Sequence, residues 1–253
     1  CLNWGCIPTK ALLRNAEVIN LLEEGRTFGF ELEGFQADYA AAVDRSRKVS
    51  NRLVKGVGSL MRKNDVRVVE GVGRLVDPHT VRVELNDGGE ETLETGAIVV
   101  ATGARARSIP GVEVDGERVI TYRPALAMRE LPESVIVVGA GPIGMEFAHV
   151  WRSYGAEVTI VEMMDRLVPL EDEEVSAQVE RAFKRRKVRL MTSTRVEGVE
   201  ATDDGVRVTV QSEDEETETL EADQALIAIG VRPNSEDLGL KEVGVELEKG
   251  WIQ

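Results

Sequence analysis

The sequence has 253 residues, of which 42% are hydrophobic, and a formal net charge of −14. This length allows one large domain or two ordinary ones, and the acidic charge disfavours binding to the phosphate backbone of nucleic acids. No apolar run approaches the ~20 residues of a membrane span and no signal peptide opens the chain, so we expect a soluble, cytoplasmic protein without a membrane partner.

Two helices are predicted in the first quarter of the chain. Residues Gly5–Glu23 carry apolar side chains at three- and four-residue steps, and Gly25 and Gly29 then break the pattern. A longer helix is expected over Asp38–Lys63, because its first aspartate can cap the N-terminus. The apolar stripe of this second helix consists of Val43, Val49, Leu53, Val57 and Leu60.

Short strands separated by turns are predicted next. They span Val66–Val69, Arg74–Val76, Val81–Leu85 and Glu91–Thr95. The turns contain Asp77-Pro78 and Asp87-Gly88-Gly89. Ala97–Ala101 is a continuous apolar run, which predicts a strand buried on both faces. Ser108–Gly111 has the character of a linker.

Strands and helices alternate in a second unit that begins near Leu131. Strands are predicted at Val135–Val138, Glu157–Glu162, Val188–Met191 and Ala225–Ile229. Helices are predicted at Pro142–Tyr154 and Glu171–Lys187, and a hairpin at Val206–Gln211 and Thr217–Ala222. Strands joined by helical crossovers form parallel sheets with right-handed connections, so the expected fold class is α/β with a doubly wound, Rossmann-like sheet.

A glycine-rich motif links the first strand of this unit to its first helix. Residues Gly139–Gly144 read GAGPIG, which matches G-x-G-x-x-G in the context of a dinucleotide-binding turn. The first glycine permits the tight turn, Gly141 lets the backbone approach a pyrophosphate, and the third glycine allows close helix–strand packing. The next strand ends at Glu162, whose carboxylate can bind ribose hydroxyls and would repel a 2′-phosphate. The motif therefore predicts NAD, with NADP kept open as the alternative by Arg166.

The only two cysteines, Cys1 and Cys6, lie at the start of the first helix. The helix dipole favours a thiolate at Cys6, and Lys10 follows one turn later, where it can face the same site. The spacing alone equally fits two ordinary buried cysteines. Residues 1–13, CLNWGCIPTKALL, however, resemble the redox-active disulfide signature of the pyridine nucleotide–disulfide oxidoreductases, and within that family its dihydrolipoamide dehydrogenase branch. Trp4 is unusual, but it falls at a variable position.

The resemblance extends along the chain and implies its domain organisation. Residues 98–104 resemble the family's FAD-contacting segment, 158–162 its NAD-type second strand, and 226–234 the segment that closes its NAD domain. By this resemblance, residues 1–112 form part of an FAD-binding domain. Residues 113–235 form an NAD-binding domain with a β-hairpin or meander insert, and 236–253 begin the return to the FAD and central domains.

The resemblance also implies roles for individual residues. Cys1 would exchange disulfide with the substrate, Cys6 would face the flavin, and Lys10 would lie near the flavin, paired with Glu146. The implied FAD contacts are Lys10, Gly73, Thr102, Gly103 and Ala104. The implied NAD contacts are Gly139, Gly141, Pro142, Ile143, Gly144, Glu146, Glu162, Val196 and Gly230.

The implied activity is the oxidation of dihydrolipoyl groups with FAD and NAD. The partners would be 2-oxoacid dehydrogenase or glycine cleavage complexes, and the full-length parent would be a homodimer. The alternatives are another flavoprotein disulfide or mercuric reductase, and a non-catalytic NAD-binding fragment. The family's first FAD glycine loop and its C-terminal domain, which carries a catalytic His–Glu pair, have no counterpart here. We therefore expect an internal segment that is inactive alone, with His79 and His149 in structural or surface roles and no metal site.

Overall fold

A computed structural model describes residues 1–253 and divides them into two compact units. The first unit comprises Cys1–Lys55 and Ala106–Gly230, and the second comprises Gly56–Arg105 and Val231–Gln253. The division follows internal contacts, whereas the domain boundaries expected at residues 112 and 235 remain predictions. None of the helices combines the length and the apolar character that a bilayer crossing requires.

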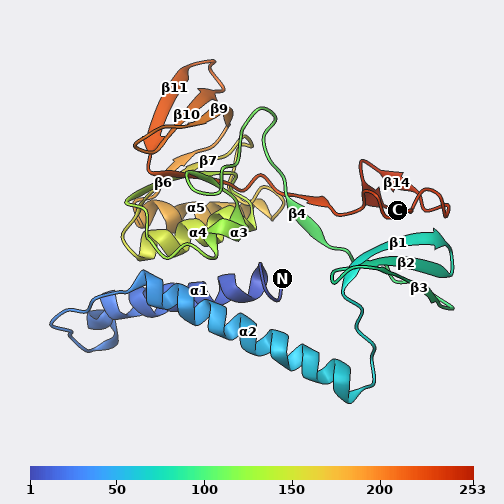
Figure 1. Ribbon diagram of the computed structural model, residues 1–253. Coiled ribbons are helices and arrows are strands. Elements are labelled where there is room, and N and C mark those ends of the chain that lie inside the picture. Colours follow the sequence, from blue (N-terminus) through green and yellow to red (C-terminus); the bar gives the residue numbers. More distant parts are fainter. The chain divides into compact units, whose positions relative to one another are not determined.

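The first unit is built on a five-stranded sheet in which every neighbouring pair is parallel (Figure 1). In spatial order the strands are β5 (Val119–Ile120), β12 (Gln224–Ile227), β6 (Ser134–Val138), β7 (Glu157–Val161) and β8 (Arg189–Met191). Alternate residues of β6 enter different cores. Val135 and Val137 belong to the cluster on the helical face, while Ile136 and Val138 belong to the cluster on the opposite face. The predicted α/β class with a doubly wound parallel sheet is confirmed.

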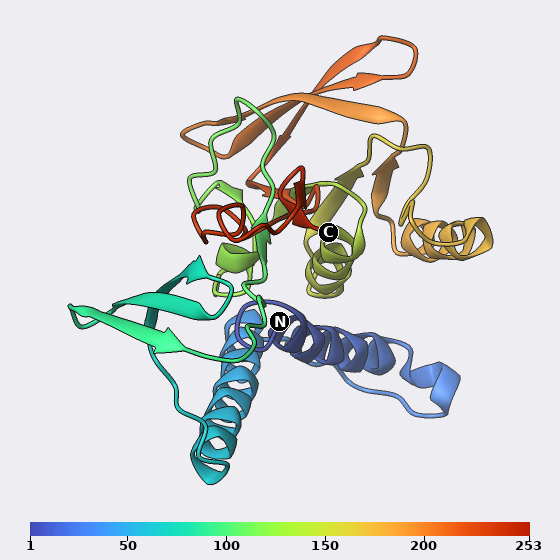
Figure 2. The same cartoon turned by 90° about the vertical axis from the view of Figure 1, so that its right-hand side faces the viewer.

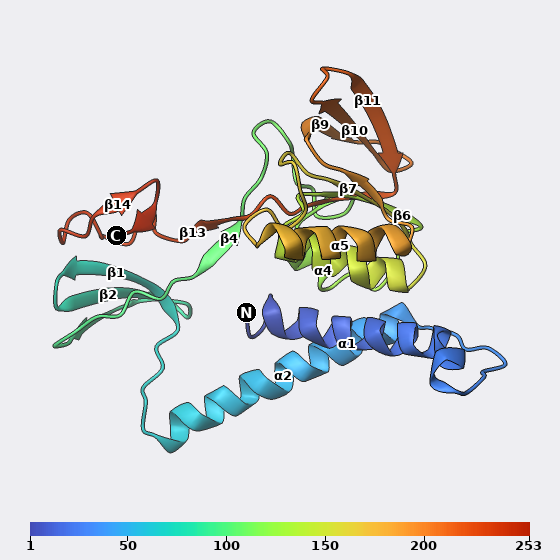
Figure 3. The same ribbon diagram turned by 180° about the vertical axis from the view of Figure 1, so that it is seen from behind.

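Helices cover one face of this sheet (Figure 3). The helices of the chain are α1 (Cys6–Glu23), the 3-10 turn η1 (Gly25–Phe28), α2 (Tyr39–Lys63), α3 (Tyr122–Ala125), α4 (Pro142–Ser153) and α5 (Glu173–Arg185). Leu12 of α1 and Trp151 of α4 share one core and are fully buried. Asp38 caps α2 by accepting from Ala41 N at 2.9 Å, as predicted, and Asp172 caps α5 in the same way.

A three-stranded antiparallel meander covers the other face of the sheet, and it runs across the top of Figure 2. Its strands are β9 (Thr194–Ala201), β10 (Val206–Ser212) and β11 (Thr217–Ala222), in the order β11-β10-β9. Val199, Val208 and Leu220 pack with Ile136 and Ile227 of the parallel sheet. The hairpin is confirmed, and β9 is an additional strand that the hairpin prediction lacked.

The second unit consists of small sheets. Strands β1 (Gly71–Asp77), β2 (Thr80–Leu85) and β3 (Glu90–Glu94) form one sheet in sequence order. Strands β4 (Ala104–Ala106) and β13 (Val231–Pro233) form a two-stranded pair, as do β14 (Leu247–Glu248) and β15 (Trp251–Ile252). The turn between β2 and β3 contains Gly88 and Gly89, both with positive φ.

Two predicted strands are absent from this structure. Val66–Val69 and Ala97–Ala101 are not strands, and the side chains of Val68 and Val99 are 63% and 88% exposed. No strand of the chain pairs with either segment, so their backbone groups have no ladder partners. The apolar stripe of α2 is also only partly buried: Val43 is buried, whereas Leu60 is 53% exposed. An apolar pattern indicates that a segment is suited to burial, but the segment becomes buried only where another element covers it.

Tyr39 makes the stability of the first unit sensitive to alkaline pH. Its hydroxyl accepts a hydrogen bond from Trp151 Nε1 at 2.9 Å, and burial raises the pKa of Tyr39 from 10.0 to about 12. The stabilisation from this group is complete below pH 10 and is lost as pH rises from 10 to 12, because the unfolded chain releases the proton first. The difference amounts to about 3 kcal/mol at most.

We therefore expect the urea midpoint to fall steeply between pH 10 and 12. In Tyr39→Phe the fall should be smaller, leaving the part due to Tyr154, whose pKa burial also raises. Urea titrations monitored by circular dichroism would give the midpoint at each pH in this range. An equal fall of the midpoint with pH in the variant and the wild type would contradict the assignment to Tyr39.

Candidate functional site

The glycine loop between β6 and α4 contains two glycines that the fold itself requires. Gly139 has φ +103°, and a Cβ there would lie 2.6 Å from the Ala228 carbonyl oxygen. A Cβ on Gly144 would collide with the Gly139 carbonyl oxygen. Gly141 differs, because its φ of −74° is ordinary and a Cβ would meet nothing within 4 Å. Packing therefore explains the first and third glycines, and the space at Gly141 is free for a ligand at the N-terminus of α4.

Glu162 follows β7 and faces this loop. It is 9% exposed, and its two carboxylate oxygens accept from Ala140 N at 2.7 Å and Met164 N at 2.9 Å. A carboxylate has about four acceptor positions, so it can still bind ribose hydroxyls. Arg166, the residue that kept NADP open, is held instead by Glu173 at 3.2 Å and by the Pro169 carbonyl oxygen.

A cavity of about 560 Å³ opens beside these groups, at the carboxyl ends of the parallel strands. This is where doubly wound sheets bind ligands. Seven predicted NAD residues line the cavity: Gly139, Gly141, Pro142, Ile143, Glu162, Val196 and Gly230. Gly144 and Glu146 do not line it, since the first packs beneath the loop and the second pairs with Lys10.

Several lining residues were not predicted from the sequence. They include Arg107, Ile109, Met163, Leu170 and Arg195. Leu170 is 96% exposed and Met163 64% exposed, so apolar side chains stand open to solvent at this cavity. The position of Met163 directly after Glu162 was an available signal. Arg107, Ile109 and Leu170 belong to loops without a recognisable motif, and Arg195 lies in β9.

The cysteine pair forms a disulfide at the start of α1, with the two Cα atoms 4.5 Å apart. Cys1 and Cys6 are both exposed, so a dithiol can reach them. The loop is closed by a hydrogen bond from Ile7 N to Cys1 O at 3.0 Å. Gly5 fits tightly, because a Cβ there would lie 3.1 Å from Cys1 Cα. Lys10 forms an ion pair with Glu146 of α4, which links the cysteine helix to the helix after the glycine loop.

Two of the residues expected to contact FAD in the second unit, Thr102 and Gly103, are held by Asn234. Its backbone N–H donates to the Gly103 carbonyl oxygen at 3.0 Å, and its carbonyl oxygen accepts from Thr102 Oγ1 at 2.6 Å. Gly103 has φ +73°, which favours glycine. Ala104 begins β4, and Gly73 lies within β1. The sequence alone assigns no role to Asn234, so its clamping of this turn is a structural finding.

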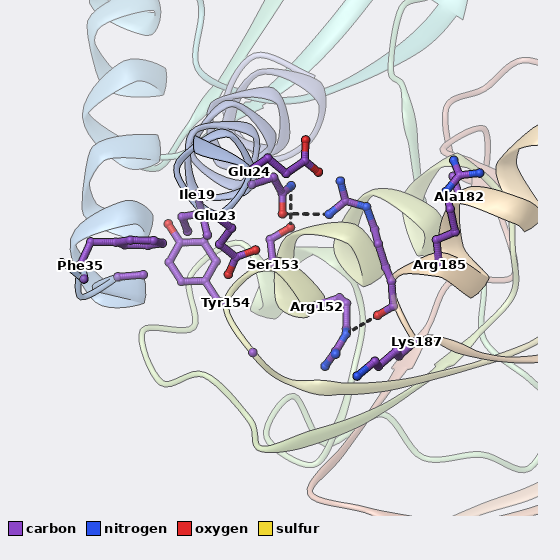
Figure 4. A pocket seen from close by; sticks show the side chains of 15 residues that line it. Ile19, Glu23, Glu24, Phe35, Arg152, Ser153, Tyr154, Ala182, Arg185 and Lys187 are labelled. Atoms are coloured by element: carbon purple, nitrogen blue, oxygen red, sulfur yellow. Dashed lines mark hydrogen bonds between the residues drawn. The ribbon is translucent and has the colours of Figure 1, made fainter. Parts of the chain in front are cut away.

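A second cavity, of about 970 Å³, lies at the C-terminal ends of α1, α4 and α5 (Figure 4). Two of its arginines are already engaged. Arg152 Nε donates to the Arg186 carbonyl oxygen at 2.6 Å, and Arg186 donates to Asn20 Oδ1 at 2.8 Å. These contacts satisfy helix ends and a buried amide, so we assign the cavity a structural role.

The two histidines make local contacts. His79 is exposed in the turn after β1 and lies 3.2 Å from the Thr95 carbonyl oxygen. His149 is half-buried near the Phe183 ring, and burial, followed by the charge of Arg186, lowers the pKa of its imidazole. Their assignment to structural or surface roles remains a prediction.

Comparison with known proteins gives concordant matches. The family model described as pyridine nucleotide-disulphide oxidoreductase matches residues 1–253. Dihydrolipoyl dehydrogenases of Zymomonas mobilis and Chlorobaculum parvum are 42% and 44% identical over 100% of the chain and 54% of each relative. That of Mycobacterium tuberculosis is 44% identical over 98% of the chain and 53% of its own length. The chain thus spans about half the length of the curated relatives it matches.

Solved structures agree with these matches. The crystal structure of LpdA from Mycobacterium tuberculosis has a TM-score of 0.88 and 30% identity, covering 98% of this chain and 54% of that one. The flavoprotein disulfide reductase RclA from Escherichia coli, in its Cu(II) complex, has a TM-score of 0.80 and 25% identity, covering 99% and 52%.

Proposed function

We propose a function from the premise that this chain belongs to the pyridine nucleotide-disulphide oxidoreductase family, as the match over residues 1–253 shows. The function would be that of a dihydrolipoyl dehydrogenase, which oxidises dihydrolipoyl groups with FAD and NAD. One observation carries the proposal: the helix that begins with the disulfide, α1, is joined by the Lys10–Glu146 ion pair to α4, whose N-terminus lines the nucleotide cavity. The curated relatives, at 42% and 44% identity, favour this enzyme over the alternative of another disulfide reductase such as RclA.

NAD fits the residues of the first unit. The backbone of Gly139–Ile143 and the N-terminus of α4 would hold its pyrophosphate, and Glu162 would hold the ribose hydroxyls. Val196 and Gly230 would complete the cavity wall. NAD accepts a hydride when bound, and the apolar side chains of Ile109, Met163 and Leu170 would pack against the bound nucleotide.

FAD fits in part. Each unit carries residues proposed for it: Lys10 in the first unit, and Gly73, Thr102, Gly103 and Ala104 in the second. The support is the positive φ of Gly103 and the hydrogen bonds that fix its turn. FAD, when bound, carries electron pairs between the cysteine pair and NAD. We propose residues 1–112 and 236–253 as parts of the FAD and central domains, and 113–235 as the NAD domain.

The two cysteines would react with the substrate by thiol–disulfide exchange. A dihydrolipoyl thiolate attacks the sulfur of Cys1, the Cys1–Cys6 bond breaks, and Cys6 leaves as a thiolate near the N-terminus of α1. The second substrate thiol then attacks the mixed disulfide on Cys1. The products are a cyclic lipoyl disulfide and two reduced cysteines, with two electrons transferred. The parent enzyme would be a cytoplasmic homodimer that serves 2-oxoacid dehydrogenase or glycine cleavage complexes.

Thiol counting with dihydrolipoamide tests this proposal. Both cysteines are in the disulfide, so the chain should show no reactive thiol before treatment and two after treatment and removal of the reagent. A chain that binds NADH but gains no thiols would instead be the alternative, a non-catalytic nucleotide-binding module.

The nucleotide preference should depend on Glu162. We expect NADH to bind at least tenfold more tightly than NADPH, which is about 1.4 kcal/mol, because the Glu162 carboxylate repels a 2′-phosphate. Glu162→Gln should reduce this preference to about threefold or less. The measurement is a titration of each reduced nucleotide by its fluorescence. Arg166→Gln is the matched control, because its guanidinium is held by Glu173. A preference that changes with Arg166 and not with Glu162 would reverse the assignment.

A further inference from the structure

Arg47 of α2 contacts the middle of the loop between the two cysteines. Its Nη1 donates to the Asn3 carbonyl oxygen at 2.6 Å, and its Nη2 donates to Asn3 Oδ1. The guanidinium carbon also lies 3.9 Å from the centroid of the Trp4 ring, within the range of a cation–π contact. A single side chain thus holds both residues at the centre of the Cys1–Cys6 loop.

The surroundings of Arg47 strengthen these contacts. Burial lowers the pKa of Arg47, so the guanidinium has given up part of its hydration to reach this position. Hydrogen bonds from a charged donor are stronger where water competes less. Arg123 of α3 approaches the same Trp4 ring, with its guanidinium carbon 5.2 Å from the centroid. Trp4, the unusual residue of the cysteine motif, therefore has two cationic partners.

Other restraints on the loop act at its ends. Ile7 N donates to Cys1 O at 3.0 Å, and Thr9 donates to Gly5 O through both its backbone N–H and its hydroxyl. The Thr9 bonds belong to the first turn of α1, and none of these bonds involves Asn3 or Trp4. The hydrogen bonds to Asn3 come from Arg47.

We propose that Arg47 is a positioning residue that keeps the Cys1–Cys6 loop in its closed shape after reduction and thereby sets how readily the pair is reduced. Breaking the disulfide releases the loop, and a released loop gains conformational entropy. A clamp on Asn3 and Trp4 limits that gain, so the effective concentration of one thiol at the other stays high. Reoxidation is then favoured, and the disulfide is harder to reduce. The inference rests on the proposed function in requiring that Cys1 and Cys6 form the reducible disulfide.

The test is the equilibrium of the chain with dithiothreitol. One reductant thiolate attacks a cysteine sulfur and breaks the protein disulfide, and the second reductant thiol releases the mixed disulfide as a cyclic product. Two electrons and two protons pass to Cys1 and Cys6. We expect Arg47→Met to shift this equilibrium about tenfold towards the reduced form, which corresponds to ~30 mV for a two-electron couple. The equilibrium of Arg47→Lys, which retains a cation, should lie between those of the wild type and Arg47→Met.

Arg45→Met is the matched control. Arg45 lies on the same helix and also bonds to α1, donating to the Ala11 carbonyl oxygen at 3.2 Å and to Asn15 Oδ1 at 3.1 Å, with no bond to the cysteine loop. Its equilibrium should equal that of the wild type. Circular dichroism checks folding, and Arg47→Lys carries the test if Arg47→Met does not fold.

Three outcomes would overturn the clamp. In the first, the dithiothreitol equilibrium of the Arg47 variants lies within twofold of that of the wild type. The second is an equal shift for Arg45→Met. Both leave the proposed function intact, because the wild-type disulfide is still reduced by the dithiol. The third is a wild type without a reducible disulfide, and that result alone would remove the proposed function as well.

Discussion

Replacing Gly144 by alanine is expected to destabilise the first unit more than any other single methyl addition in the nucleotide site. The added Cβ would collide with the Gly139 carbonyl oxygen and would also lie 3.0 Å from Val137 Cγ1. The first obstacle is backbone of the turn between β6 and α4 and the second is a buried side chain of β6, so relief requires the helix to move away from the sheet. Forcing atoms into a packed core typically costs 1–3 kcal/mol, and we expect about 3 kcal/mol here. For a chain of this size that is a fall of ~10 °C in Tm.

Gly141→Ala is the matched control, because it adds the same methyl group to the same loop. No atom lies within 4 Å of the position that its Cβ would occupy, and its φ of −74° suits alanine. Tm should therefore stay within about 2 °C of the wild type. The methyl group would instead stand between the backbone and a pyrophosphate, so NADH affinity should fall at least tenfold, or about 1.4 kcal/mol.

Thermal unfolding and NADH titration of both variants separate a folding role from a binding role. Gly144→Ala should lose stability first and binding in consequence, whereas Gly141→Ala should lose binding alone. A Gly141→Ala chain that binds NADH as well as the wild type would show that the nucleotide does not approach this part of the loop. Equal Tm for Gly144→Ala and the wild type would show that α4 can move away from the sheet without a loss of stability.

Elements whose signal is local could be predicted from the sequence. The strand–glycine–helix unit at Val135–Ser153 combines a buried β-branched run, a turn that only glycine allows, and an amphipathic helix, and all three agree. Helix α2 was found from Asp38 and its apolar period. Fold class followed because alternation of strands and helices leaves few topologies.

Elements whose signal depends on a partner could not be predicted in the same way. Ala97–Ala101 has the composition of a central strand, but whether it forms one depends on neighbouring strands to share its hydrogen bonds. β9 has a weak signal of its own, because its alternation is interrupted: Val196 and Val199 are three residues apart, and the pairing with β10 shifts register between them. Tertiary context decides both cases.

The candidate site shows the same division. Gly139, Gly141 and Glu162 form a motif, because their spacing reflects one local turn and the strand after it. The contacts of Arg47 with Asn3 and Trp4, and those of Asn234 with Thr102 and Gly103, join positions far apart in the sequence. A single sequence carries no periodic or spacing signal for such contacts.

Replacing Cys6 by serine is expected to abolish the thiol relay completely. The variant keeps the shape of the side chain but has one sulfur, so no dithiol can exchange with a protein disulfide. Thiol counts should be one per chain, both before and after dihydrolipoamide, against none and two for the wild type. The small closed loop adds only about 2 kcal/mol of stability by restricting the unfolded chain, so the variant should still fold. Wild type reduced with dithiothreitol is the matched reference, and its urea midpoint should equal that of Cys6→Ser.

Cys1→Ser should show the same thiol count, and the comparison of the two variants assigns the two roles. Cys6 is the first residue of α1, where the positive end of the helix dipole stabilises a thiolate, whereas Cys1 lies outside the helix. The remaining thiol of Cys1→Ser should therefore react several-fold faster with iodoacetamide at neutral pH than that of Cys6→Ser. Faster alkylation of Cys1 would instead make Cys1 the stabilised thiolate, and it would reverse the order in which the two sulfurs meet the substrate and the flavin.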